Sequence, residues 1–193
     1  MEYNFFAMIS RMKFIERWSL MRNSRQENLS EHSLEVSMLA HVLAVISNER
    51  LGNNLNTEKA ALIGIYHDAT EIITGDMPTP IKYYNKNIQG AFKEVEKEAA
   101  SRLISMLPQY LQNNYKDIFF PTEEDAYLWK LVKAADKLSA LIKCIEEEKA
   151  GNTEFIRAKN SILQLIKDMD LKEVDIFMEE FLSAYSKTLD ELN

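Results

Sequence analysis

The residues in this sequence with the clearest capacity for chemistry are two histidines and two aspartates. His67 and Asp68 are adjacent, His32 lies in an earlier segment, and Asp136 lies in a later one. Imidazole nitrogens and carboxylate oxygens together suit divalent transition metals. Asp136 follows Ala135 within an apolar helical stripe, where an unpaired carboxylate is costly to bury. A metal ion is a partner that would offset this cost, so we predict a metal site.

Helical spacing adds one carboxylate to this group and removes one histidine. Glu71 follows His67 by four positions and Asp68 by three, so the three side chains share one side of a continuous helix. His41 follows His32 by nine positions, which places the two side chains on opposite sides of their helix. We therefore expect His41 to be a core or surface histidine that does not share a metal with His32.

The composition predicts that helices position these residues. Gly and Pro account for 5 and 4 of the 193 residues, well below the roughly 12% average, and an all-β fold needs many turns built from them. The length suggests one domain, over residues 1–193. The single cysteine, Cys144, excludes an internal disulfide framework. We predict an all-α bundle of about six or seven helices.

Caps, breakers and apolar spacing predict where these helices lie. Residues 19–29 are expected to form a loop, and residues 77–80 an extended segment, because a proline disfavours helix in the residue before it. One helix carries a buried stripe of Leu128, Leu131, Ala135, Leu138, Ile142 and Ile145. The predicted helices are 3–16, one from the N-cap Ser30 to about Arg50, one from near Asn56 through Ile73, 86–107, one from the N-cap Thr122 to Gly151, 153–168 and 171–190.

The charge distribution restricts the class of partner. The net charge is −7, which disfavours a nucleic acid polymer as a partner. Residues 1–26 nevertheless carry a net charge of +3, so the remainder carries −10. This basic segment either neutralises a small anion or consists of solvated surface cations. Its cations are Arg11, Lys13, Arg17, Arg22 and Arg25.

The sequence indicates a cytoplasmic protein without a membrane partner. The acidic Glu2 and the early Arg11 and Lys13 are unlike a signal peptide. The longest stretches without Asp, Glu, Lys or Arg, Val36–Asn48 and Leu103–Tyr115, have 13 residues and are too short to span a bilayer.

The ordered set His32, His67-Asp68 and Asp136 resembles the H…HD…D pattern of the HD-domain superfamily of metal-dependent phosphohydrolases. Further segments look like the bacterial 5′-deoxynucleotidase family within that superfamily, in order and over nearly the whole chain. These segments are Arg17-Trp18, Ser30-Glu31-His32-Ser33, Tyr66-His67-Asp68-Ala69-Thr70-Glu71, Gly75-Asp76-Met77-Pro78-Thr79-Pro80 and Ala135-Asp136.

This resemblance implies a role for each matching residue. The metal ligands would be His32, His67, Asp68 and Asp136, of which all but His67 would also contact substrate. Glu71 would assist the attacking water, and Arg17 would contact the phosphate. Trp18 would pack on the sugar and exclude a ribose 2′-hydroxyl. The nucleotide pocket would be lined by Asp76, which lies near the 3′-hydroxyl, and by Met77, Pro78 and Thr79.

The resemblance also implies a cofactor, a substrate and an assembly. These are one divalent transition metal (cobalt, manganese, iron or zinc), a deoxyribonucleoside 5′-monophosphate, and a homodimer. Alternative hypotheses are an HD phosphohydrolase for a cyclic or hyperphosphorylated nucleotide, a catalytically silent nucleotide-binding regulatory module, and a helical interaction protein. Multi-metal HD phosphodiesterases need additional histidines, and with His41 out of phase this chain has none to spare. The interaction protein leaves the buried position of Asp136 unexplained.

Overall fold

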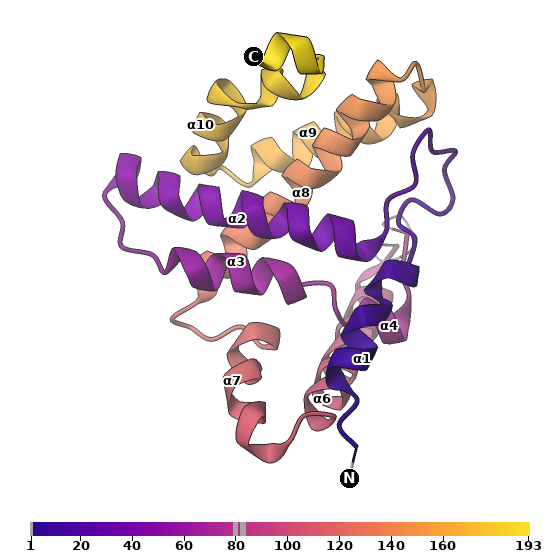
Figure 1. Ribbon diagram of the computed structural model, residues 1–193, viewed down its shortest axis with the longest axis vertical. Helices are drawn as coiled ribbons and strands as arrows, with labels where there is room; N and C mark the ends of the chain where they lie inside the picture. The colour runs from indigo at the N-terminus through magenta and orange to yellow at the C-terminus, as the bar shows by residue number, and fades with distance from the viewer. Residues whose placement is uncertain (1, 79–80, 82–83) are drawn as a thin grey trace.

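A computed structural model describes residues 2–78, 81 and 84–193 as an assembly of helices (Figure 1). Extended pairing within these residues is limited to one isolated antiparallel bridge between Glu16 and Asn28. The predicted all-α fold is confirmed. The α-helices are α1 (Phe5–Ile9), α2 (Leu29–Leu51), α3 (Thr57–Tyr66), α4 (Glu71–Thr74), α6 (Lys86–Ser105), α7 (Gln109–Phe119), α8 (Ala126–Lys149), α9 (Ile156–Asp168) and α10 (Lys172–Glu180). Short 3₁₀ helices are η1 (Ser10–Phe14), η2 (Thr153–Phe155), η3 (Leu182–Ser186) and η4 (Leu189–Leu192).

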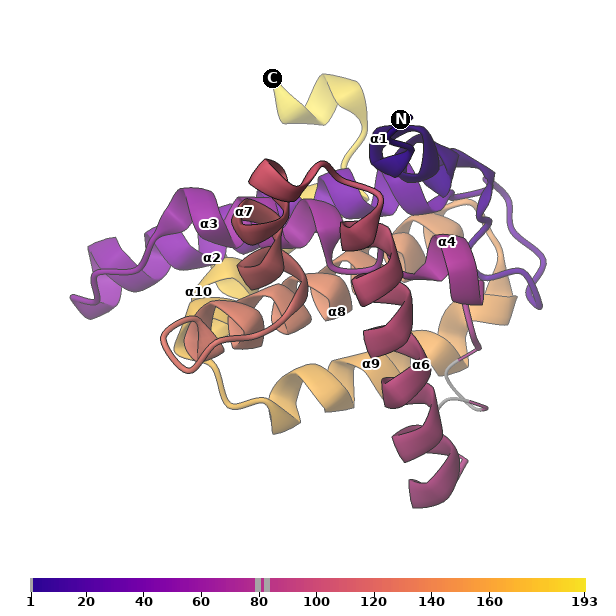
Figure 2. The same ribbon diagram turned by 90° about the horizontal axis from the view of Figure 1, so that it is seen from below.

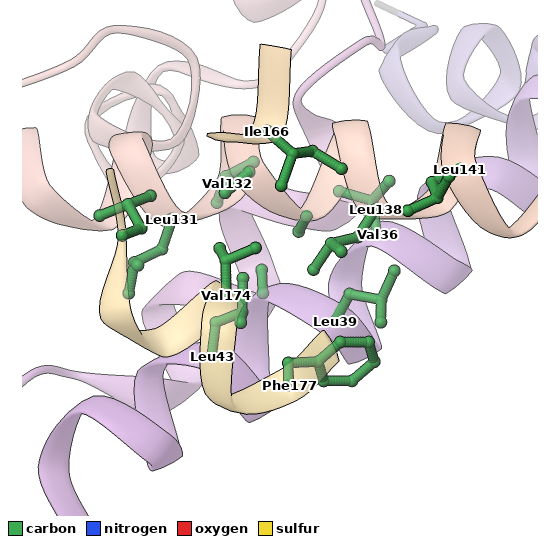
Figure 3. Packing of buried hydrophobic residues seen from close by; sticks show 14 of the residues in the cluster. Val36, Leu39, Leu43, Leu131, Val132, Leu138, Leu141, Ile166, Val174 and Phe177 are labelled. Carbon is green, nitrogen blue, oxygen red and sulfur yellow. The ribbon is translucent and has the colours of Figure 1, made fainter. Parts of the chain in front are cut away.

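The main core lies where α2 and α8 meet and where α9 and α10 cover them. Figure 3 shows side chains from these four helices pointing toward one another. The apolar stripe predicted on α8 is buried from Leu128 to Ile142 and half-buried at Ile145. The labelled residues of this core are Val36, Leu39, Leu43, Leu131, Val132, Leu138, Leu141, Ile166, Val174 and Phe177.

A second, smaller apolar cluster joins α1, α6 and the turn after α3. Its buried residues are Phe5, Met12, Leu29, Ala69, Leu103 and Leu107. The C-terminal part of α6 packs there, whereas its N-terminal half projects from the body and is mostly exposed (Figure 2). Along the chain, His32 lies between Leu29 of this cluster and Val36 of the main core. The candidate ligands therefore lie where the two apolar clusters adjoin.

Close packing of α3 on α2 depends on Gly64. A Cβ atom at this position would lie 2.7 Å from the Ser37 Cα atom, which is closer than real Cβ contacts come. Ser37 Oγ donates a hydrogen bond to the Ala61 carbonyl (2.9 Å) across the same contact. Glycine thus allows the two helices to approach at this point.

α2 begins two residues earlier than the cap prediction implies. The N-cap is Asn28, not Ser30, and Asn28 Oδ1 accepts hydrogen bonds from the backbone N–H groups of Ser30 (3.0 Å) and Glu31 (3.1 Å). Both residue types are good N-caps, so propensity alone did not separate them. The end of the helix is as predicted, because Gly52 has a left-handed φ of 73°.

The helix predicted from Asn56 through Ile73 is divided in the structure. α3 ends at Tyr66, residues 67–70 form a turn, and α4 begins at Glu71. The backbone here tightens to three-residue hydrogen bonds, such as Ala69 N–H to Tyr66 O (3.0 Å) and Glu71 N–H to Asp68 O (2.9 Å). The His67 side chain bonds to the Gly64 carbonyl oxygen, which a continuous helix would use for its own ladder.

Other boundaries also differ from the predictions. α7 was not predicted, because its stretch between Pro108 and Pro121 lacks a strong cap signal; Ile118 is its buried residue. The N-cap of α8 is Asp125, not Thr122; Thr122 Oγ1 instead accepts from the Asp125 backbone N–H (3.2 Å). The predicted helices 3–16 and 171–190 are each divided into an α-helix followed by 3₁₀ turns.

α2 is, among the described residues, the one helix long and apolar enough to cross a membrane by length and composition. Of its most apolar window, 56% is buried inside the protein. It supplies the core with residues such as Leu39, Leu43 and Ala44.

Candidate metal and phosphate site

The structure brings the four predicted metal ligands together from α2, α8 and the turn after α3. One ligand atom from each residue lies within 4.8 Å of the others. His32 Nε2 is 3.4 Å from Asp136 Oδ1 and 3.5 Å from Asp68 Oδ2, and His67 Nε2 is 3.0 Å from Asp68 Oδ2. Among the described residues, this is the one group of His, Cys, Asp and Glu side chains with such a spacing.

Hydrogen bonds on the far side of each imidazole orient its Nε2 atom into the cluster. His67 Nδ1 lies 2.8 Å from the Gly64 carbonyl oxygen, which only accepts, so Nδ1 carries the hydrogen. His32 Nδ1 lies 3.1 Å from Ser139 Oγ, which in turn donates to Glu35 Oε2 (2.5 Å). Such outer contacts are typical of metal-ligating histidines.

The Nε2 atoms themselves fit a metal better than they fit hydrogen bonding. Both are buried, and in the described part of the chain neither has a hydrogen-bond partner with suitable angles. They converge with the carboxylate oxygens of Asp68 and Asp136 on one point. Two imidazole nitrogens and two carboxylate oxygens form a donor set that divalent transition metals accept.

The electrostatics of the cluster also favour a cation. Burial and Arg17 lower the pKa of His32, but contacts with Asp136, Asp68 and Glu27 outweigh them and raise it to about 10. Burial raises the pKa of the Asp68 carboxyl, but His67 and His32 hold it well below its usual range. The concentrated negative charge therefore stabilises positive charge at this position.

Among the described residues 2–26, Arg17 is the one side-chain cation that reaches the cluster. Its Nη1 is 3.5 Å from Asp68 Oδ2 and its Nη2 is 3.9 Å from Asp136 Oδ1. The side chain is only 12% exposed. Burial lowers the pKa of Arg17, but Asp68, Asp136, Glu27 and Asp76 raise it above its ordinary value. The exposed cations of the segment are Arg11, Lys13, Arg22 and Arg25.

Trp18 lies beside Arg17 in an unusual backbone conformation. Its φ is 55°, in the left-handed region that side chains other than glycine rarely adopt. The indole Nε1–H donates to Glu27 Oε2 (2.9 Å), and the ring lies 5.3 Å from the Phe155 ring. Backbone strain of this kind persists only where the surroundings hold it.

The remaining predicted residues lie in and after α4. Glu71 is buried as the first residue of α4, and its backbone N–H binds the Asp68 carbonyl, which keeps it one turn from Asp68. Asp76 is near enough to act electrostatically on Arg17. Met77 and Pro78 follow in a segment that is neither helix nor strand, whereas Thr79, predicted to line the nucleotide pocket, lies outside the described residues.

The structure separates His41 from the cluster, as its helical phase predicted. His32 is 1% exposed, whereas His41 is exposed on the outer side of α2. The nine-residue spacing therefore assigned the two histidines correctly to opposite sides.

Two residues of the site were missed by the sequence analysis. Lys137 Nζ lies 2.7 Å from Asp136 Oδ2, and its position next to a predicted ligand was a signal that could have found it. Burial and Asp68 raise the pKa of Asp136, but Lys137 and His32 outweigh them and hold it below its usual range. Glu27 contacts Arg17, Trp18 and His32, but it lies in a loop where no spacing pointed to it.

The fold is similar to that of solved HD-domain phosphohydrolases. An HD-domain phosphohydrolase from Listeria innocua superposes with a TM-score of 0.81 at 23% identity, covering 94% of this chain and 88% of that one. The cyanophage S-2L HD phosphohydrolase DatZ, bound to dA and one catalytic Zn²⁺ ion, superposes with a TM-score of 0.64 at 20% identity, covering 94% and 96%.

The family is defined by sequence. The profile of the YfbR-like 5′-deoxynucleotidases matches residues 4–185. A 5′-deoxynucleotidase of Erwinia tasmaniensis is 47% identical over 190 residues, and one of Pectobacterium atrosepticum is 49% identical over 193; each match covers 98% of this chain and 96% of the relative. The chain belongs to the YfbR-like 5′-deoxynucleotidase family, which confirms the resemblance drawn from its motifs.

Proposed function

We propose that this protein hydrolyses deoxyribonucleoside 5′-monophosphates to deoxynucleoside and phosphate, using one divalent transition metal. The observation that carries the proposal is the cluster of His32, His67, Asp68 and Asp136 with the Arg17 guanidinium beside both carboxylates. A cation site next to a buried arginine suits a phosphate group. The 5′-deoxynucleotidases at 47–49% identity support the substrate class.

The four ligands would hold the metal, and Arg17 would hold the phosphate. When bound, the metal supplies Lewis-acid activation of a phosphate oxygen and of a water molecule. The planar guanidinium of Arg17 can bind two phosphate oxygens at once and stabilise the charge of the phosphoryl group during transfer. Lys137, on the outer oxygen of Asp136, adds a second positive charge at the same edge of the site.

Glu71 is the candidate for the proton of the attacking water. It is buried, and it lies one turn from Asp68 without being one of the four ligands. In the proposed step the water oxygen forms a bond to phosphorus and its proton passes to the Glu71 carboxylate. The bond from phosphorus to the 5′-oxygen breaks, and Glu71 returns the proton to the 5′-oxygen, which becomes the hydroxyl of the deoxynucleoside.

Selectivity for the sugar is assigned to Trp18 and Asp76. Trp18 adjoins Arg17 in sequence, so its large ring can reach the sugar of a nucleotide whose phosphate is bound by Arg17. We propose that the ring blocks a 2′-hydroxyl and that Asp76 accepts a hydrogen bond from the 3′-hydroxyl. DatZ, a structural neighbour, is described with the deoxynucleoside dA bound, which agrees with this substrate class.

A panel of metals against substrates tests the proposal. The purified protein is assayed for phosphate release from dAMP and AMP with cobalt, manganese, iron and zinc, all of which accept nitrogen and oxygen ligands. We expect metal-dependent release with dAMP preferred. Binding of dAMP without release would instead support the silent regulatory module, and equal rates on dAMP and AMP would indicate a phosphomonoesterase without sugar selectivity.

We further propose a cytoplasmic homodimer that pairs through the outer face of α2 and α3. This face presents the exposed apolar side chains of Leu34, Met38, Leu62 and Ile65. Two copies related by a two-fold axis would cover these side chains mutually. Light scattering should show a dimer for the wild type and a monomer for Met38→Glu, with Glu49→Gln on the same helix as the control. A monomeric wild type would contradict the proposal.

A further inference from the structure

Glu27 contacts three residues of the candidate site with one side chain. Its Oε2 accepts the hydrogen bond from Trp18 Nε1 (2.9 Å) and lies 3.9 Å from Arg17 Nε, while its Oε1 lies 3.5 Å from His32 Nδ1. The side chain is 14% exposed. A candidate metal ligand, the candidate phosphate-binding arginine and the Trp18 ring therefore all contact the same carboxylate.

We propose that Glu27 is a positioning residue that holds Trp18 for sugar selectivity and aligns Arg17 and His32 for phosphate and metal binding. This inference rests on the proposed function of the site. Glu27 lies on the Nδ1 side of His32, away from the Nε2 atom that would bind the metal. It would therefore act on the substrate and the metal only through Arg17, Trp18 and His32. The specificity of the enzyme then depends on a carboxylate outside the motifs that define the site.

The backbone places Glu27 firmly opposite Arg17. The Arg17 N–H donates to the Glu27 carbonyl (2.9 Å), and the Leu29 N–H donates to the Ile15 carbonyl (2.9 Å). The bridge between Glu16 and Asn28 lies between these two bonds. The segment before α2 is thereby paired with the segment after η1, and the Glu27 side chain cannot shift along it.

Trp18 needs a contact of this kind. Its backbone is in the left-handed region, so local preference does not determine where its ring points. One side of the ring packs on Phe155, and the indole N–H is bound by Glu27. A hydrogen bond to a carboxylate is stronger than one to a neutral acceptor, which suits an acceptor that must keep a ring in place.

Two substitutions at Glu27 distinguish its hydrogen bond with Trp18 from its charge interactions with Arg17 and His32. Glu27→Gln keeps a side-chain oxygen that can accept from the indole but removes the negative charge facing Arg17 and His32. Glu27→Leu removes both. Trp18→Phe removes the indole N–H together with part of the ring. Glu31→Gln is the matched control, because Glu31 is half exposed, pairs with the exposed Arg25 at 3.8 Å, and loses the same charge.

The measurements are kcat and KM for dAMP and AMP, metal content and thermal stability. If dAMP is preferred about 5–150-fold, as a buried unsatisfied hydroxyl would produce, Glu27→Leu and Trp18→Phe should each lower the preference toward 1. Glu27→Gln should retain it but lower kcat/KM on both substrates by about 5-fold or more, because it removes the carboxylate charge that faces Arg17 and His32. Glu31→Gln should match the wild type.

An unchanged dAMP preference in Glu27→Leu that is folded and active would overturn the inference. So would Glu27→Gln and Glu27→Leu with the same preference and the same kcat/KM, because a purely structural role predicts that pattern. A wild type without metal-dependent release from dAMP contradicts the proposed function instead, so the two failures are distinguishable.

Discussion

Two polar clusters lie two turns apart on α8, and they differ in whether their buried polar atoms have hydrogen-bond partners. In the first, Lys143 and Glu147 are buried, and Lys143 Nζ donates to both Glu147 Oε1 and the Arg25 carbonyl. Glu147 Oε2 accepts from the Ser24 backbone N–H (2.8 Å) and from Asn152 Nδ2 (2.7 Å). Charge is balanced within this cluster, and its polar atoms satisfy one another.

In the second cluster, around Asp136, the polar atoms do not all satisfy one another. Its imidazole Nε2 atoms are buried without well-angled partners, and two carboxylates face them. Burial of charged residues therefore does not by itself mark a functional site. A saturated cluster holds the loop of residues 22–25 on α8, whereas a cluster of converging acceptors needs a cation to complete it.

The largest expected effect comes from removing a ligand of the second cluster. Asp136→Ala should lose metal and activity together, with phosphate release from dAMP down about 10⁴-fold or more, because the metal supplies several kcal/mol of transition-state stabilisation. Metal analysis of the purified variant and circular dichroism are the measurements. A variant with wild-type metal content would show that Asp136 is not a ligand.

Glu71→Gln tests a residue that lies next to the second cluster but is not one of its four candidate ligands. The amide keeps the size of the side chain but cannot accept the proton of water. We expect kcat to fall about 10²–10⁴-fold with metal content unchanged. Single-turnover kinetics on dAMP, compared with dAMP binding by calorimetry, separates chemistry from affinity. Turnover near the wild-type rate would remove Glu71 from the mechanism.

Glu147→Ala tests the first cluster and should affect stability rather than chemistry. It leaves the Lys143 ammonium buried without its partner, which costs about 3–5 kcal/mol in the free energy of unfolding. Urea unfolding measures this loss. The exposed pair of Glu148 with Lys159 supplies the control, since Glu148→Ala should cost at most about 1 kcal/mol. Per folded molecule, kcat of Glu147→Ala should stay within a few-fold of the wild type. A larger fall would show that the first cluster also contributes to catalysis.

The first cluster should also make the free energy of unfolding depend on pH in the acid range. Burial raises the pKa of Glu147, but hydrogen bonds from Lys143, Ser24 and Asn152 outweigh it and lower the pKa from 4.5 to about 2. The ionised carboxylate therefore stabilises the fold above pH 4.5, and this contribution is lost as the pH falls from 4.5 to about 2. Urea unfolding across this range should show a flatter pH dependence in Glu147→Gln than in the wild type. Equal slopes would contradict the assignment.

His41→Gln should have the smallest effect. His41 is exposed on the side of α2 opposite His32, outside both clusters. Metal content and kcat should equal those of the wild type, within error. Loss of metal would show that His41 contributes to the second cluster.

The sequence by itself was sufficient for the helical class, the family and the four residues that the structure brings together as a candidate metal site. Each of these depends on local patterns: the His-Asp pair, the position of Asp136 in an apolar stripe, and the half-turn that separates His32 from His41. Helical periodicity relates residues within one helix, so it assigned these side chains to the correct sides.

The tertiary structure decided how separate segments meet. Periodicity carries no information about a loop, so the contacts of Glu27 could not be read from spacing, and Arg17 was singled out among five N-terminal cations only by the family resemblance. The continuous helix through Ile73 was also wrong, because the His67 side chain takes the Gly64 carbonyl and the backbone tightens after Tyr66. One physical reason applies to the contacts of Arg17, to the contacts of Glu27 and to the division of the helix after Tyr66. Long-range hydrogen bonds and charges select one arrangement among several that the local sequence permits equally.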